Sequence, residues 1–124
     1  MIADVFDLIE TTMRGLGFTL VADEESLKDR HYRIAIGEAS QANDVRGGMN
    51  SGVVRVDWTV TIRLQFSADT LSARRPRQIA VDLETVFKAI YDASKRAKLV
   101  GLGSEEATGG VIGLVAMSFD GSIT

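Results

Sequence analysis

The 124-residue sequence contains no cysteine, one proline, one histidine and one tryptophan. Without cysteine there is no disulfide framework, no thiolate nucleophile and no cysteine metal site. The apolar runs are only a few residues long, far short of the roughly 20 residues that a membrane-spanning helix needs. The N-terminal residues are acidic where a secretory signal is basic. We therefore expect one globular domain that folds in the cytoplasm and has no contact with a membrane.

Basic residues are also scarce, since 14 Lys and Arg against 17 Asp and Glu give a formal net charge of −3. This balance argues against nonspecific nucleic-acid binding as the main role. The charge is uneven along the chain. Residues 1–29 hold two basic and seven acidic side chains, whereas residues 74–98 hold seven basic and three acidic. Such a division would suit head-to-tail contacts between copies, although two helices with differently charged solvated faces would produce the same pattern.

The strongest periodic signal is the stretch VVRVDWTVTIRLQFSAD, in which apolar and polar residues alternate. It predicts a strand from Val54 to Phe66 with one apolar face. At about 3.3 Å per residue this strand would extend roughly 43 Å, whereas a domain of this length is roughly 35 Å across. The strand must therefore bend or pass beyond the edge of the domain, where another subunit would cover it.

Helical spacing of apolar residues predicts a helix over residues 2–16 and a second helix from Pro76 to Ala97. Proline is favoured as the first residue of a helix. Short strands are expected at residues 18–21 and 31–36. Residues 111–119 are apolar on both faces, which predicts a final strand in the middle of the sheet.

Two glycine-rich segments lack any periodicity. Residues 37–52 are predicted to form a long mobile loop, and residues 99–110 a turn region with at most a short strand at its start. The elements together predict an α+β fold. One mostly antiparallel sheet with a long central strand would be covered by two helices.

No catalytic or cofactor site is recognisable in the sequence. His31, the only histidine, has no nearby partners for metal binding or base catalysis. Asp57 lies between Arg55 and Arg63 on the polar face of the long strand, which is typical of cross-strand charge pairing. The glycine-rich segments do not match a dinucleotide fingerprint, a phosphate loop or a nucleophile elbow. We therefore expect no enzyme activity, no cofactor and no metal.

The order of elements resembles that of the tail-terminator proteins of long-tailed bacteriophages, which close the head-proximal end of a tail tube. The matching segments are IADVFDLIETTMRGLGF, HYRIAIGEASQ, VVRVDWTVTIRLQFSAD, RPRQIAVDLETVFKAI and GGVIGLVAMSFDGSI. The resemblance covers nearly the whole chain, in the order and length of elements rather than in particular residues. Related tail-completion and neck proteins share much of this pattern.

The resemblance implies a structural virion protein that forms a ring, typically a hexamer. The ring would cap the tail tube, stop its elongation and offer a surface for head attachment. The implied partners are other copies of the chain, the tail tube protein and a head–tail connector or neck protein. DNA would pass through the ring without specific binding. Assembly in the host cytoplasm would place the protein in the virion, at the head-proximal end of the tail.

The candidate contact residues are charged positions on the polar strand face and in the links, together with one methionine. They are Arg46, Met49, Arg55, Asp57, Arg63, Arg74, Arg75 and Arg77. The same residues would also occur in a flexible loop without a function and on charged surfaces that face only solvent. The alternative functions are a small α+β module that binds a peptide or ligand, and a related phage neck or head–tail adaptor protein.

Overall fold

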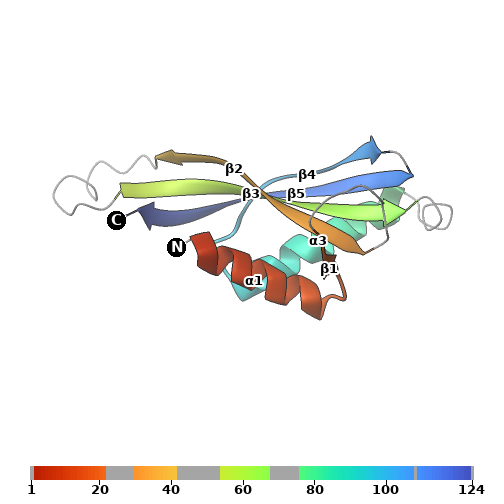
Figure 1. Cartoon of the computed structure of the whole chain (residues 1–124), viewed down its shortest axis with the longest axis horizontal. Helices are drawn as coiled ribbons and strands as arrows, with labels where there is room; N and C mark the ends of the chain where they lie inside the picture. Colours follow the sequence, from red (N-terminus) through yellow and green to blue (C-terminus); the bar gives the residue numbers. More distant parts are fainter. Residues whose placement is uncertain (1, 22–29, 42–53, 68–75, 108, 124) are drawn as a thin grey trace.

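The computed structural model describes residues 2–21, 30–41, 54–67, 76–107 and 109–123. The elements in chain order are α1 (Ile2–Gly15), β1 (Thr19–Leu20), β2 (His31–Gln41), β3 (Val54–Ser67), α3 (Pro76–Ala93), β4 (Lys98–Ala107) and β5 (Gly110–Ile123). The strands form one sheet in the order β1-β2-β3-β5-β4. Both helices lie on the same face of this sheet, and the other face carries no helix of the described ranges (Figure 1).

The predicted α+β class is confirmed, with β3 as the long central strand and two helices over one face. Three strand pairs are antiparallel, and the short β1 pairs with β2 in parallel. β5 lies between β3 and β4, as its two apolar faces predicted. The predicted helix at residues 2–16 ends one residue earlier, at Gly15.

The end of α1 shows how local sequence directs the chain from the helix into the sheet. Gly17 has a φ of 86°, a left-handed conformation that glycine adopts at little cost. The Phe18 N–H donates to the Met13 carbonyl at 3.0 Å and the Gly17 N–H donates to the Arg14 carbonyl at 3.0 Å. This pair of bonds is a Schellman motif, which satisfies carbonyls that the helix end would leave unpaired.

The core lies between the helices and the alternate residues of β3. Its β3 members are fully or almost fully buried, and they are Val56, Val60, Ile62, Leu64 and Phe66. The α3 members are Ile79, Leu83, Val86 and Ile90. Burying one such side chain stabilises the fold by roughly 1.5–3 kcal/mol. Close packing explains Gly113 on β5, where an added Cβ would lie 2.7 Å from Leu83 Cδ2 and 2.8 Å from Phe66 Cε2.

The predicted ends of α3 and β2 were wrong. α3 ends at Ala93 rather than Ala97, so the basic residues that follow it lie outside the helix. β2 continues to Gln41, which makes a strand of the first part of the predicted loop at residues 37–52. Its continuation includes a bulge between Ile36 and Ala39. Residues 42–53 lie outside the described residues.

The predicted turn region at residues 99–110 was the largest error, because β4 occupies Lys98–Ala107. The strand contains Gly101 and Gly103, residues that disfavour a strand by local preference. Its pairing with β5 extends along the whole strand, from Lys98 opposite Ser118 to Ala107 opposite Gly110. The strand is therefore formed by nonlocal hydrogen bonds that local preference does not reveal.

The long strand does pass beyond the helices, as its length predicted. In Figure 1 the start of β3 extends past the N-terminus of α1, together with the ends of β2 and β5. β3 does not bend at a bulge, since its register with β5 is continuous from Val54 to Ser67. Both of its edges are occupied within the chain, so another subunit could cover this strand only by packing on its faces. The edges that remain open belong to other strands.

Candidate functional site: the open edges of the sheet

The first open edge is that of β4, which pairs with β5 on one side and with no strand of the described residues on the other. Three aliphatic residues on this strand are exposed to solvent: Leu99 by 50%, Val100 by 60% and Leu102 by 37%. The strand has no proline, the residue that most directly blocks strand pairing. A long edge with exposed aliphatic side chains is a template for pairing with another strand.

The second open edge is that of β2, on the opposite side of the sheet. β1 pairs with β2 only at His31 and Tyr32. From Ile34 onward the outer edge of β2 has no strand partner among the described parts of the chain. Ile36 on this edge is 47% exposed. The sheet therefore has an open edge with exposed aliphatic surface at each end of the strand order.

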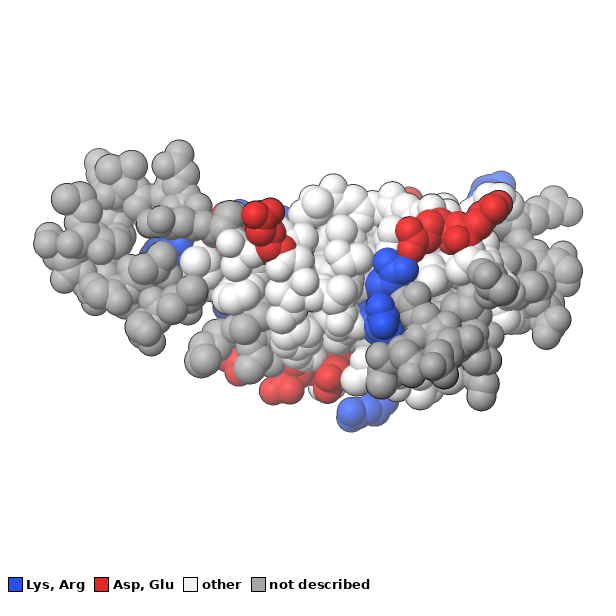
Figure 2. Space-filling view, turned by 45° about the horizontal axis from the view of Figure 1, so that its top comes forward, with Lys and Arg blue, Asp and Glu red and all other residues white. Residues whose placement is uncertain are grey.

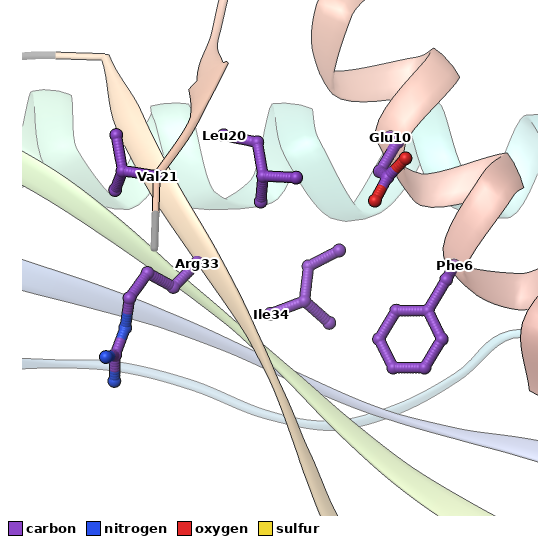
Figure 3. A pocket seen from close by; sticks show the side chains of 6 residues that line it. All are labelled: Phe6, Glu10, Leu20, Val21, Arg33 and Ile34. Atoms are coloured by element: carbon purple, nitrogen blue, oxygen red, sulfur yellow. The ribbon is translucent and has the colours of Figure 1, made fainter. Parts of the chain in front are cut away.

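A groove of about 550 Å³ lies beside the second edge, between α1 and β2. The residues that line it are Phe6, Glu10, Leu20, Val21, Arg33 and Ile34. Figure 3 shows Phe6 and Glu10 directed from α1 toward Ile34, with Leu20 above, while the Arg33 guanidinium points away from the helix. The groove thus offers a recess with both apolar and polar walls next to open strand backbone, with the Glu10 carboxylate among its lining groups.

Acidic residues lie near the C-terminal end of β4, and a basic residue lies immediately before β2. Glu105 and Glu106 lie near the end of β4, where Arg63 Nη2 is 2.5 Å from the Glu105 carboxylate. Arg30 lies just before β2. Its Nε donates to the Gly17 carbonyl at 3.3 Å, its Nη2 donates to the Leu16 carbonyl, and its guanidinium lies 4.4 Å from the Phe18 ring centroid. Arg30 therefore links the end of α1 to the start of β2.

An arginine occupies the edge of β5 beyond the point where β4 begins. Arg96 Nε donates to Asp120 Oδ1 at 3.1 Å, and its Nη2 donates to the backbone carbonyl of the same residue. The hydrogen bond from Arg96 lowers the pKa of the Asp120 carboxyl. Since these contacts use the polar groups at Asp120, the open edge on this side of the sheet is that of β4.

The structure does not bring the predicted contact residues together. Arg55, Asp57 and Arg63 lie along the helix-free face of β3, and Arg77 is exposed in the first turn of α3. Figure 2 shows much of this face as an uncharged band across the middle of the molecule, with charged side chains toward its ends. The other four candidates, Arg46, Met49, Arg74 and Arg75, lie outside the described residues.

The exposed aliphatic residues of the two edges were missed by the sequence reasoning. Leu99, Val100 and Leu102 fell in a segment predicted to be a turn, because the glycines between them suggested irregular structure. Ile36 was placed on a short strand with no indication that one edge of this strand is open. The available signal was the mixture of large aliphatic and glutamate residues in LVGLGSEE, which is unusual for a solvated turn.

The described residues hold no group of three or more His, Cys, Asp and Glu side chains that could bind a metal ion. In the same ranges, neither helix is long and apolar enough to span a membrane. No protein-family model matches the chain, and no curated protein matches it. The features of the molecule that bear on its function are therefore the fold and the two open edges.

Proposed function

We propose that this protein is a structural subunit that assembles with copies of itself into a ring, and that the ring is the tail terminator of a long-tailed bacteriophage. The observation that carries the proposal is the pair of open edges on opposite sides of one sheet, each with exposed aliphatic side chains. Two different surfaces that meet make a head-to-tail contact, which repeats from subunit to subunit. Such a contact closes into a ring when the rotation between subunits allows it.

The phage role is supported by the order of elements along the chain, which resembles that of tail-terminator proteins. In this role a hexameric ring caps the tail tube and presents its other side to a connector or neck protein. DNA passes through the opening without specific binding. The function is structural and needs no cofactor.

One observation favours a second candidate, a module that binds an extended peptide. The groove beside β2 combines an open strand edge with a recess of mixed apolar and polar lining. A peptide could add as a further strand through main-chain hydrogen bonds, with one side chain in the recess. This module would be a monomer whose β2 edge is occupied by a partner of another kind.

The test is the mass of the purified protein across a concentration series, with and without purified tail tube, together with negative-stain imaging of large species. Hollow rings, alone or at the end of a tube, are the expected result. A protein that remains monomeric at every concentration, and that does not bind the tube, would contradict the proposal. Saturable binding of an extended peptide by that monomer would favour the second candidate.

A further inference from the structure

The directions of the two open strands are compatible with pairing between copies. β2 is antiparallel to β3, β3 to β5 and β5 to β4, so β2 and β4 run in opposite directions at the two sides of the sheet. A second copy placed beside the first in the same orientation therefore presents its β2 antiparallel to β4. This is the same relation that the three long strand pairs of the sheet already have.

The apolar residues of the two edges lie at the same levels of the sheet. A row is the set of residues that lie opposite one another on neighbouring strands. One row consists of Leu99, Met117, Val60 and Ile36, and another of Leu102, Val115, Ile62 and Ile34. Both rows lie on the helix-bearing face, where Val60 and Ile62 are fully buried. If a second copy adds without sliding along the strands, Leu99 lies beside its Ile36 and Leu102 beside its Ile34.

The surfaces that would meet in these rows match in character. Leu99 and Ile36 are each about half exposed, at 50% and 47%, so both have apolar surface left to bury. Leu102 would approach Ile34, which lines the groove between α1 and β2. The groove is thus placed to receive a leucine from the neighbouring copy, on the face where the neighbour's own helices also lie.

A charged pair lies at one end of the same alignment. One row contains Lys98, Ser118 and Thr59, and Thr59 lies opposite the bulge that contains Glu38. Without sliding, Lys98 approaches Glu38 of the next copy. At the other end β1 pairs with His31 and Tyr32 of β2, so the contact with the next copy extends from Lys98 to Gly103.

We propose that β4 of one copy pairs antiparallel with β2 of the next copy in this unshifted register. Leu99 contacts Ile36, Leu102 enters the groove beside Ile34, and the pair of Lys98 and Glu38 fixes the alignment. A slide by one residue would turn the apolar side chains to the other face of the sheet. A slide by two would separate the charged pair. This pairing rests on the proposed self-assembly and specifies its contact.

The test uses the absence of cysteine, which makes introduced thiols the only ones in the chain. Ile36→Cys and Leu99→Cys are combined in one chain, and the assembled protein is oxidised and separated under denaturing, non-reducing conditions. The expected result is a ladder of covalent species up to the subunit number of the ring. An equimolar mixture of the two single variants should instead yield covalent dimers that contain one of each.

The matched control combines Leu99→Cys with Val81→Cys, since Val81 is 45% exposed but belongs to α3 and not to either open strand. It should remain uncross-linked. Rings that form without a bond between positions 36 and 99 would overturn the pairing and leave the proposed function standing. Covalent dimers from Leu99→Cys alone would indicate β4 pairing with itself and would also overturn it. A protein that never associates, with or without tail tube, would overturn both.

Discussion

Replacing Leu99 by lysine separates assembly from folding most directly. The residue is half exposed, and the aliphatic stem of lysine can keep part of the contacts of its buried half, so the free energy of unfolding of the monomer should fall by at most about 1 kcal/mol. In the proposed contact the same side chain becomes buried. Half of a leucine's burial free energy is about 1 kcal/mol, and a lysine at a strand edge adds a cost because its ammonium must leave water.

We expect the dissociation constant of the subunit contact to rise by about 30-fold, which corresponds to about 2 kcal/mol per contact. Sedimentation velocity across a concentration series measures assembly, and urea unfolding of the monomer measures stability. Val81→Lys, at a similar exposure on α3, is the matched control and should change neither quantity. If Leu99→Lys assembles as well as the unmodified protein, the β4 edge is not the contact and the reasoning from exposed edge residues fails.

Three further substitutions, together with Gly103→Ala as a control, test the packing and electrostatics of the fold. Gly113→Ala should lower the free energy of unfolding by about 1–3 kcal/mol in urea titrations, since its Cβ would overlap a helix side chain and an aromatic ring. Gly103→Ala, with open space around it, should not destabilise the protein in the same titration. Gly17→Ala should cost about 1 kcal/mol because of its positive φ, and a full retention of stability would contradict the Schellman assignment. Arg96→Gln should raise the pKa of Asp120 in an NMR titration. The native contact lowers this pKa, so its stabilisation is fully present above the ordinary carboxyl pKa and is lost as the pH falls through the lowered value. The stability difference between the two proteins should therefore begin to shrink below about pH 4 and vanish below the lowered pKa. An Asp120 pKa that is the same in both proteins would show that the arginine contact is absent in solution.

The elements with strong periodicity were predictable because their pattern is local. The apolar stripe of α1 and the alternation in β3 each repeat over enough residues to identify the element, and the structure confirms both. The central place of β5 was also predictable, because a run that is apolar on both faces is typical of a strand inside a sheet rather than at its edge.

The candidate contact residues were less predictable, because the reasoning selected charge rather than edge position. Arg63 was expected at an interface, but its guanidinium is paired with Glu105 within the chain. The exposed residue Leu99 was passed over, since an aliphatic side chain in a glycine-rich segment carries no local sign that it lies on an open edge.

The sequence by itself determined which segments are amphipathic, because side-chain spacing along the chain decides which residues share a face. It thereby determined the α+β class, the long central strand and the two core-facing helices. Only the tertiary structure decided that Lys98–Ala107 is a strand, since its hydrogen-bond partners lie on β5. It alone also decided that β2 and β4 carry the open edges, because an edge depends on which strands pair, and that choice is made between segments distant in sequence.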